Sequence, residues 1–480
     1  MKVKINPKVV VSIVYITAMF MAAMDATIVN VALQTISKEL QVPPSAMGTV
    51  NVGYLVSLAI FLPISGWLGD RFGTKKVFLT ALLVFTIASA LCGIANDITS
   101  LNIFRIIQGA GGGLLTPVGM AMLFRTFSPE ERPKISRFIV LPIAVAPAIG
   151  PIIGGFFVDQ MSWRWAFYIN LPFGIIALLF GLLFLAEHIE KSAGRFDSLG
   201  FVLSAPGFAM LIYALSQGPS KGWVSKEIIS IGIAGIVLLT LFIIVELKVK
   251  QPMLDLRLLK EPVFREMSLI SLFSSAGLLG MLFIFPLMYQ NVIGVSALES
   301  GLTTFPEAIG LMISSQVVPW SYKKFGARKV ISIGLVSTAV IFILLSFVNH
   351  DTNPWQIRAL LFGIGIFLGQ SVGAVQFSAF NNITPPSMGR ATTIFNVQNR
   401  LGSAIGVAVL ASILSGFGSN NVQNNAQSDF LPYQAALIGS AIFLLIALLF
   451  SLRISDKEVM SKKNKKPLSV LQKEKEVVNE

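Results

Sequence analysis

Residues 66–76 read Gly-Trp-Leu-Gly-Asp-Arg-Phe-Gly-Thr-Lys-Lys and come directly after a long apolar stretch. A second segment, residues 319–329, reads Pro-Trp-Ser-Tyr-Lys-Lys-Phe-Gly-Ala-Arg-Lys and also ends an apolar stretch. Both segments contain Phe-Gly-x-basic-Lys, and each follows the second apolar stretch in a series of six. The repeat therefore predicts a chain with two related halves.

The composition indicates that lipid surrounds most of the chain. Of its 480 residues, 54% are hydrophobic and 13% are charged, whereas soluble domains carry about 25% charged residues. Apolar runs of about 18 or more residues recur along the whole length, and each can cross a bilayer core. Because backbone polar groups in lipid must be paired internally, these runs predict helices and not barrel strands.

The apolar runs predict an all-α polytopic membrane protein. We expect fourteen transmembrane helices arranged as six, two and six, with the extra pair within 199–247. The predicted spans are residues 8–33, 46–69, 77–95, 101–124, 135–159, 163–186, 199–217, 226–247, 265–291, 299–320, 330–348, 357–380, 392–416 and 433–453.

The distribution of Lys and Arg predicts the orientation of the spans. Most of the 37 Lys and Arg residues fall in alternate loops, such as 71–76, 125–137 and 323–329, and in the tail after 453. Cytoplasmic loops are enriched in these residues, so we expect both termini in the cytoplasm of a multi-pass cell (plasma) membrane protein. The same rule accounts for the net charge of +13 without a nucleic-acid partner.

The spans divide the chain into four segments. Residues 1–190 are expected to form the N-terminal six-helix half, and 191–260 the extra helix pair with its linkers. Residues 261–453 are expected to form the C-terminal half. The last segment, 454–480, is rich in Lys and Glu, which predicts a disordered cytoplasmic tail.

Several kinds of chemistry lack a signal in the sequence. The only cysteine, Cys92, lies in an apolar run, and His188 and His350 fall in predicted loops, so we expect no metal site and no cofactor. The sequence contains no Gly-x-x-x-x-Gly-Lys-Ser/Thr loop for nucleotide phosphates. Any uphill transport by this chain would therefore use an ion gradient.

The segment 66–76 resembles the loop signature of the major facilitator superfamily. The matching residues are Gly66, Asp70, Arg71, Gly73 and Lys75. Gly66 permits close approach of helices, Asp70 can cap a helix or form an ion pair, and the basic residues can bind helix C-termini or acidic partners. The alternative is an ordinary basic loop, but the spacing after the second span favours the signature and implies the major facilitator fold.

The predicted fifth span carries a motif that bears on the direction of transport. Gly150, Pro151, Gly154 and Gly155 are similar to the antiporter motif Gly-Pro-x-x-Gly-Gly of this superfamily, with Ala146 where the family usually has Gly. That motif is associated with exporters. Together with the loop signature, these residues are candidates for a role in conformational change.

Other segments resemble a narrower group, the fourteen-spanner drug:proton antiporters of the EmrB/QacA type. These segments are 24–33 in the first span, 105–109 in the fourth, 163–172, and 389–406, where Asn399-Arg400 replaces the usual Arg-Gln. The resemblance covers the chain up to its tail. It implies a non-enzymatic monomer that exports small cationic or amphipathic drug-like compounds by alternating access, driven by protons.

Two acids within predicted spans are candidates for this chemistry. Asp25, expected about 12 Å from the outer end of its helix, is a candidate proton carrier and substrate ligand. The superfamily resemblance implies that Arg105 is its partner. Glu307 and Tyr289 are candidate substrate-binding residues. Asp25 and Glu307 could also be structural, and Arg105 could extend toward the interface. Aromatic residues that could line a cavity for flat cations are Phe61, Trp67, Phe285, Phe305 and Phe380.

Other functions remain open from the sequence. A solute importer of the same fold is disfavoured by the antiporter motif, whereas an exporter or flippase of one endogenous metabolite or lipid is not excluded. An intramembrane enzyme would need a metal cluster or a paired catalytic site, and none stands out. A receptor or scaffold would be expected to have longer soluble segments. The expected partners are therefore small-molecule substrates, protons and membrane lipid.

Overall fold

The computed structural model describes residues 6–42, 47–128, 131, 145–146, 149–150, 152–158, 160–190, 194–418 and 430–454. Over these residues the regular structure is helical. The helices are α1 (Pro7–Glu39), α2 (Gly48–Phe61), α3 (Ser65–Phe72), α4 (Thr74–Gly93), α5 (Ile98–Thr126), α7 (Trp165–Tyr168), α8 (Asn170–Phe184), α9 (Ser198–Lys221), α10 (Lys226–Lys248), η2 (Leu256–Lys260), α11 (Pro262–Asn291), α12 (Ala297–Phe325), α13 (Ala327–Ser346), α14 (Pro354–Ala379), η3 (Pro385–Ser387), α15 (Met388–Gly418) and α16 (Leu431–Leu452).

The helices confirm a multi-pass membrane protein. Within the described ranges, 11 helices are long and apolar enough to cross a membrane, or 12 when α2 and α3, bent by 53°, count as one broken span. The predicted span 135–159 lies largely outside the described residues. Helix α12 is 29 residues long but falls below the same level of apolarity because Glu299, Glu307 and Gln316 interrupt it.

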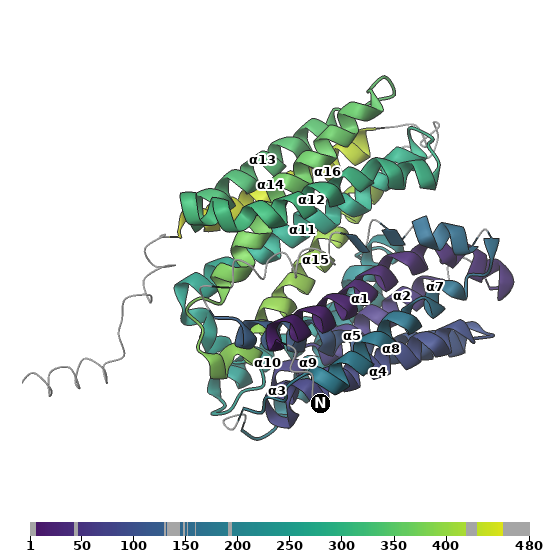
Figure 1. The fold of residues 1–480 in the computed structure, drawn as a ribbon. Coiled ribbons are helices and arrows are strands. Elements are labelled where there is room, and N and C mark those ends of the chain that lie inside the picture. Colours follow the sequence, from purple (N-terminus) through teal and green to yellow (C-terminus); the bar gives the residue numbers. More distant parts are fainter. Residues whose placement is uncertain are drawn as a thin grey trace, which may run out of the picture.

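The helices form two bundles with the same internal packing (Figure 1). In the first bundle, α5 packs on α2 and α4, and α8 packs on α1 and α4. In the second, α14 packs on α12 and α13, and α16 packs on α11 and α13. The second and fourth helices of each bundle are therefore neighbours in both, as the repeated segments predict for related halves.

Glycines allow these two equivalent helix pairs to approach closely. A methyl group added at Gly109 of α5 would overlap the carbonyl oxygen of Tyr54 in α2. A methyl group at Gly365 of α14 would likewise overlap the carbonyl oxygen of Glu307 in α12. Small residues at membrane helix interfaces permit this kind of backbone contact. Tyr54 and Glu307 thus hold equivalent places, in the same register that aligns 66–76 with 319–329.

The extra helix pair lies beside both bundles. Helix α10 packs on α9 and η2, whereas α9 contacts α2 of the first bundle and α15 of the second. The turn between α9 and α10 is anchored as well, because Trp223 Nε1 donates a hydrogen bond of 2.6 Å to Ser412 Oγ of α15. Helix α10 is therefore peripheral, as predicted for the extra pair, while α9 bridges the bundles.

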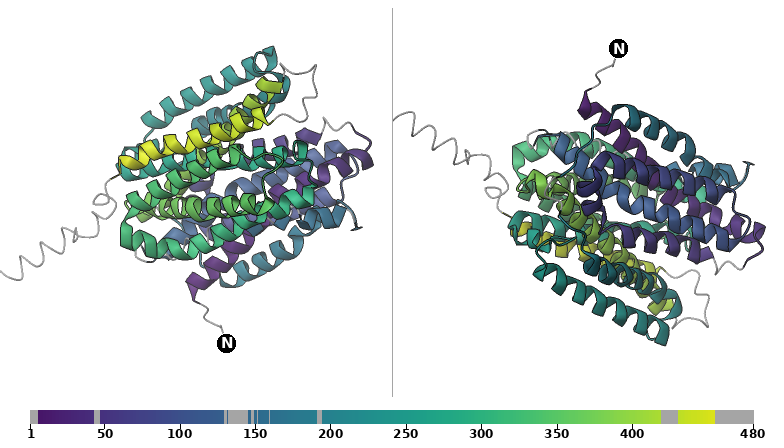
Figure 2. Two further views of the ribbon diagram at one scale, coloured as in Figure 1. Left: turned by 90° about the horizontal axis from the view of Figure 1, so that it is seen from above. Right: turned by 90° about the horizontal axis from the view of Figure 1, so that it is seen from below.

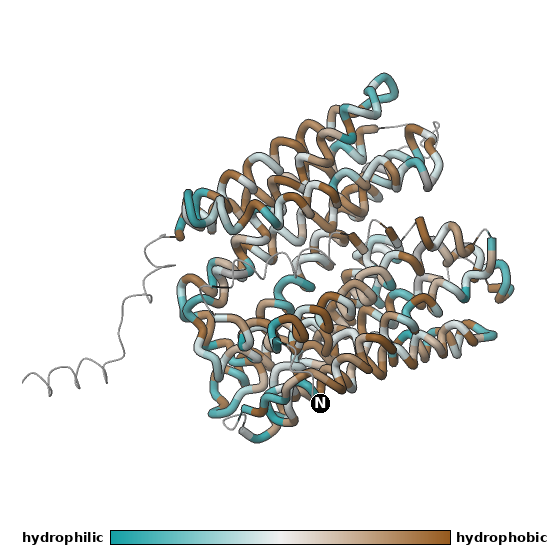
Figure 3. The backbone as a smooth tube through the Cα atoms, viewed as in Figure 1, coloured by the Kyte–Doolittle hydropathy of each residue, from teal (hydrophilic) through white to brown (hydrophobic). Residues whose placement is uncertain are grey.

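Hydrophilic residues gather at the ends of the helices, and a mostly hydrophobic band lies between them (Figure 3). Helix α1 begins and α16 ends at the same end of the molecule (Figure 2). The α3–α4 and α12–α13 connections lie there too, with Arg71, Lys75, Lys323, Lys324 and Arg328. We call this the basic end, and the other the opposite end.

Candidate functional site

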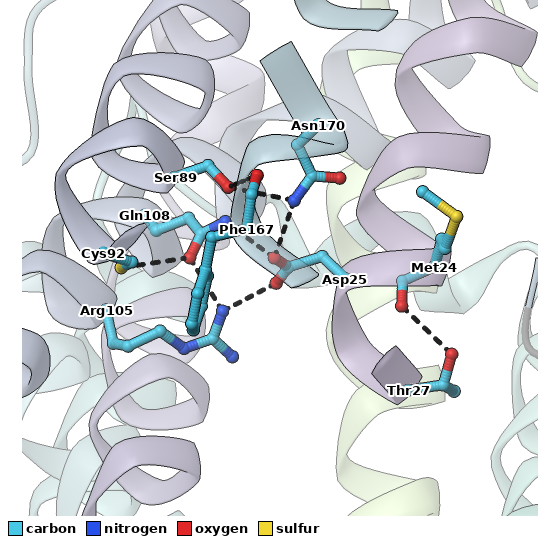
Figure 4. Close-up of polar contacts among 9 residues, drawn as sticks. All are labelled: Met24, Asp25, Thr27, Ser89, Cys92, Arg105, Gln108, Phe167 and Asn170. Atoms are coloured by element: carbon cyan, nitrogen blue, oxygen red, sulfur yellow. Dashed lines mark hydrogen bonds and ion pairs between the residues drawn. The ribbon is translucent and has the colours of Figure 1, made fainter. Parts of the chain in front are cut away.

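A buried network of polar side chains surrounds Asp25 in the middle of α1 (Figure 4). Asp25 and Arg105 are 0% and 1% exposed, and Arg105 Nη1 donates to Asp25 Oδ2 over 2.7 Å. Gln108 Nε2 and Asn170 Nδ2 both donate to Asp25 Oδ1 over 2.9 Å. Three buried donors therefore satisfy both oxygens of this carboxyl group inside the bundle.

Further contacts orient the donors. Arg105 and Gln108 are one turn apart on α5, so they face α1 together, and Arg105 Nη1 also donates to Gln108 Oε1 over 2.7 Å. Asn170, at the start of α8, donates to Ser89 Oγ over 2.9 Å, and Ser89 donates to the Phe167 carbonyl over 2.9 Å. Helices α1, α4, α5 and α8 therefore all contribute to one network.

The guanidinium of Arg105 is enclosed by aromatic rings. The ring centroid of Tyr54 lies 4.3 Å from Arg105 Cζ, and that of Phe167 lies 5.8 Å away. A buried ion pair is strongly destabilised when one partner alone loses its charge, by about 3–5 kcal/mol. Asp25 and Arg105 therefore depend on each other for charge compensation inside the bundle.

The predicted contact between Asp25 and Arg105 is confirmed, but the first helix is longer than predicted. Helix α1 continues past residue 33 to Glu39, so Asp25 lies near its middle. The last turns are too polar to have been assigned to the span from the sequence. They are held by an ion pair between Glu39 and Arg164 and by the Ser37 hydroxyl, which donates to the Val42 carbonyl over 2.8 Å.

Sequence reasoning missed two of the partners of Asp25. Gln108 and Asn170 each lie in a segment that carries the family resemblance, but neither was expected to bind the carboxylate. A signal was available for Gln108, since it follows Arg105 by one helical turn. Ser89, which holds Asn170 in place, has no comparable signal in the sequence.

The second acid has a different environment. Glu307 of α12 is 5% exposed, and among the described residues its carboxylate has no hydrogen-bond or ion-pair partner. Tyr289, near the end of α11, is 2% exposed and stacks on Phe285 with ring centroids 5.5 Å apart. No described contact joins Glu307 to Tyr289, so a shared site remains a prediction.

Two of the predicted cavity aromatics lie at the basic end instead. Trp67 packs on Phe72 and Phe196, with ring centroids 5.7 and 4.9 Å apart. Phe380, at the end of α14, packs on Phe124 at 4.5 Å. Whether either ring lines a cavity for flat cations stays a prediction.

The loop signature is held by specific contacts at the basic end. Asp70 Oδ1 pairs with Arg125 Nη2 over 2.6 Å. Lys75 Nζ donates to the Leu182 carbonyl over 2.9 Å, close to the end of α8. The backbone N–H of Lys75 donates to Glu187 over 2.9 Å. The expected pairing of Asp70 and the expected binding of Lys75 to a helix C-terminus are confirmed.

Gly73 and Arg71, two further residues of the loop signature, lie at the connection between α3 and α4. Gly73 joins α3 to α4 with φ of 101°, a conformation that favours glycine. Arg71 is exposed at the same connection. The basic charge of Arg71 therefore contributes to the surface of the basic end.

The signature also joins the two bundles. A methyl group at Gly66 would lie 2.6 Å from Thr393 Oγ1 and 2.7 Å from the Gly389 carbonyl oxygen of α15. The Ser65 and Thr393 hydroxyl oxygens are 3.1 Å apart. A methyl group at Gly389 would in turn lie 2.6 Å from Asp70 Oδ1. The predicted close approach at Gly66 is confirmed, and its partner is a helix of the other bundle.

Helix α15 makes further contacts with α5 nearby. Thr392 Oγ1 donates to the Pro117 carbonyl over 3.2 Å. One turn further along, Asn396 Nδ2 lies 3.2 Å from Met120 Sδ. These contacts and those at Gly66 all involve the part of α15 nearest the basic end.

The antiporter motif packs on α1 beside Asp25. Methyl groups at Gly150 and Gly154 would overlap Thr27 and Ile28. Gly155 faces open space, and Pro151 lies outside the described residues. The motif therefore limits the space around the part of α1 that follows Asp25.

Comparisons with known proteins agree with this architecture. The sequence model of the Major Facilitator Superfamily matches residues 15–407, and again 323–478. The multidrug transporter protein MdtP of Bacillus subtilis is 32% identical over 424 residues, which is 88% of this chain and 78% of MdtP. The putative multidrug resistance protein MdtD of Pectobacterium atrosepticum is 31% identical over 444 residues, 90% of this chain and 93% of MdtD.

The fold has a counterpart among solved structures. The human organic anion transporter MFSD10 matches with a TM-score of 0.65 over 93% of this chain and 100% of the other, at 15% identity. This chain belongs to the major facilitator superfamily. It is a multi-pass membrane transporter and not an enzyme.

Proposed function

We propose that this transporter exports small cationic or amphipathic drug-like compounds across the cell membrane, driven by the proton gradient. The buried pair of Asp25 and Arg105 is the observation that carries the proposal. The names of MdtP and MdtD support the substrate class. The narrower assignment to the fourteen-spanner drug:proton antiporters rests on the sequence motifs that carry the resemblance. The Gly150–Gly155 segment is one of these motifs.

Asp25 is the proposed proton carrier. In one state it is ionised and bound to Arg105, Gln108 and Asn170. In the other it is protonated, and Arg105 turns to Gln108, whose Oε1 already accepts from the same Nη1 atom. Because proton uptake removes the central charge, each proton bound changes which contacts hold α1 against α5.

The proposed topology has fourteen spans in the order six, two and six. The first half comprises residues 1–190, the extra pair lies within 191–260, and the second half comprises 261–453. The basic end is the cytoplasmic end, since it carries the Lys-rich and Arg-rich loops. Both termini are then cytoplasmic, although residues 455–480 of the predicted tail lie outside the described residues. One chain is the proposed functional unit.

Alternating access follows from where the bundles touch. The contacts of Gly66 and Thr392 with the other bundle lie at the basic end. With that end in the cytoplasm, they form the closed inner gate. Transport would require these contacts to break so that the bundles rock about a central site. Glu307 and Tyr289 are the proposed substrate-binding residues of the second bundle, with Asp25 facing from the first.

Inverted membrane vesicles test the proposal. With a pH gradient imposed, vesicles with the wild-type chain should accumulate ethidium and rhodamine 6G, and an ionophore that collapses the gradient should stop the accumulation. The Asp25→Asn variant should accumulate neither dye. Dye accumulation that continues after the pH gradient has been collapsed would contradict proton coupling. Failure to move any dye in a broad panel would favour the alternative, an exporter or flippase of one endogenous metabolite or lipid.

A further inference from the structure

Arg400 is a second basic residue at membrane depth, and the Asp25 network does not use it. It lies on α15, which has 31 residues, and the helix rise places it about 18 Å from the start of α15. A charged side chain that faces lipid at such a depth is costly. Arg400 must therefore face protein or water.

The contacts of α15 show which way Arg400 faces. Gly389, Thr393 and Asn396 lie three or four residues apart and all contact the first bundle. Residues with this spacing share one face of a helix. Arg400 follows Asn396 by four residues, so it continues the same face one turn further from the basic end. It therefore points toward the first bundle and not toward lipid.

The surroundings of Arg400 differ from those of Arg105, the other arginine at membrane depth. Its side chain is exposed, and among the described residues it has no hydrogen bond or ion pair. It lies close enough to the Tyr54 hydroxyl for a Coulomb interaction. The Tyr54 ring in turn covers Arg105. Arg400 thus lies on the face of α15 that contacts the first bundle, on the side of the Asp25 network, and its guanidinium has no partner among the described residues.

Arg400 has no negative charge among the described residues to compensate it. Asp25 is already compensated by Arg105, so the network does not supply a free counter-charge to Arg400. If the bundles approach each other at the opposite end, Arg400 moves toward Arg105, and like charges in a low-dielectric interior repel. A guanidinium presents several donors that suit carboxylate or phosphate groups. An anionic group between the bundles would remove the repulsion.

We propose that Arg400 binds an acidic group of the transported molecule, so that the substrates include amphipathic carboxylates and zwitterions. This inference rests on the proposed export function for its physiological meaning, and it extends the substrate class beyond cations. The same face of α15 then both seals the basic end and recognises the substrate.

Binding of two xanthene dyes of opposite charge tests the assignment. The purified full-length protein is titrated with 6-carboxyfluorescein, an anion, and rhodamine 6G, a cation, and binding is followed by fluorescence anisotropy. Arg400→Gln should raise the Kd of carboxyfluorescein by about tenfold or more and leave that of rhodamine 6G within about twofold. Arg400→Lys should retain part of the affinity, because the charge remains. Arg358→Gln, which removes an arginine stacked on Trp355, should change neither.

Each result has a defined meaning. The assignment is overturned if the wild-type protein does not bind carboxyfluorescein, if Arg400→Gln leaves its Kd unchanged, or if both dyes weaken equally. The same proteins are then assayed for pH-driven dye accumulation in vesicles. If the binding pattern holds but neither dye is transported, Arg400 is an anion-binding residue and the proposed export function is wrong.

Discussion

At the residue scale, the two acids at membrane depth are held in opposite ways. Asp25 is bound by a guanidinium and two amides, all buried. Glu307 is nearly as buried but has no partner among the described residues. A buried charge is tolerated when it is paired and otherwise tends to be neutralised. These environments fit the proposed roles of Asp25 as proton carrier and of Glu307 as substrate ligand.

Asp25→Asn should separate transport from binding. Asparagine keeps the shape and can accept hydrogen bonds, but it does not titrate. Uphill export of every substrate should therefore stop, while equilibrium dye binding to the purified protein persists. The buried Arg105 loses its counter-charge, so the midpoint of thermal unfolding should also fall, in line with a cost of about 3–5 kcal/mol. Asp25→Glu serves as the control, because it keeps a titratable carboxyl group. Normal pumping by Asp25→Asn would exclude Asp25 as the proton carrier.

Glu307→Gln should affect substrates according to their charge. A carboxylate compensates a positive charge strongly where the dielectric constant is low. Export of a dication should therefore weaken most, that of a monocation less, and that of a neutral compound least. Initial rates in energised vesicles measure this for one substrate of each kind. Equal loss of all three would indicate a role in coupling or folding and not in substrate recognition.

At the element scale, the packing of each bundle depends on glycines at helix crossings. Gly109 of α5 packs against α2, and Gly365 of α14 packs against α12 at the equivalent place. Each crossing also positions a candidate site residue, Tyr54 over Arg105 in the first bundle and Glu307 in the second. The repeated architecture therefore places different side chains at matching points, which lets the halves divide the chemistry.

Gly365→Ala should destabilise the protein because the added methyl group overlaps a carbonyl oxygen. Overpacking of this kind costs about 1–3 kcal/mol. Gly301→Ala is the matched control, since Gly301 lies on α12 with nothing within 4 Å of the added atom. The midpoint of thermal unfolding, measured on the purified proteins, should fall for Gly365→Ala and stay constant or rise for Gly301→Ala. An unchanged midpoint for Gly365→Ala would show that the crossing tolerates a methyl group, and a fall of the same size for both variants would show that the loss is not specific to the crossing.

The sequence predicted the helices better than the contacts between them. Hydropathy locates a span because lipid selects apolar residues, and charge fixes its direction. It does not detect a polar helix end such as the last turns of α1, nor does it show how a helix is rotated. The pairing of Asp25 with Arg105 was predicted from the superfamily resemblance, which places the first and fourth spans side by side. The role of Asn170 and the position of Phe380 depend on rotation and depth, which the sequence alone does not determine.

At the scale of the whole molecule, the two bundles act as bodies that meet through α15. Its part nearest the basic end packs on α3 and α5, while its other end is tied to the extra pair through Trp223. Helix α9 bridges the bundles by contacting α2 and α15. If the bundles rock as proposed, the contacts of α15 at the basic end must change, and small residues pack closely enough there to be cross-linked.

A disulfide across that junction should stop transport. The hydroxyl oxygens of Ser65 and Thr393 are 3.1 Å apart, so the pair of substitutions Ser65→Cys and Thr393→Cys needs only small shifts to reach a sulfur–sulfur bond of about 2.05 Å. Native Cys92 is buried and free, and it stays in place. Oxidation should abolish dye accumulation in vesicles, and a reductant should restore it, because the bond holds the basic end closed.

The control for this lock is a disulfide of similar geometry within one bundle. The hydroxyl oxygens of Ser332 and Ser451, in α13 and α16, are 2.8 Å apart. Both helices belong to the second bundle, so the pair Ser332→Cys and Ser451→Cys should cross-link without restricting the rocking motion. After oxidation, vesicles with this pair should therefore transport dye as fast as the same vesicles do after treatment with a reductant. Undiminished transport by the oxidised Ser65–Thr393 pair would mean that α3 and α15 stay together throughout the cycle, and the inner gate would have to open elsewhere.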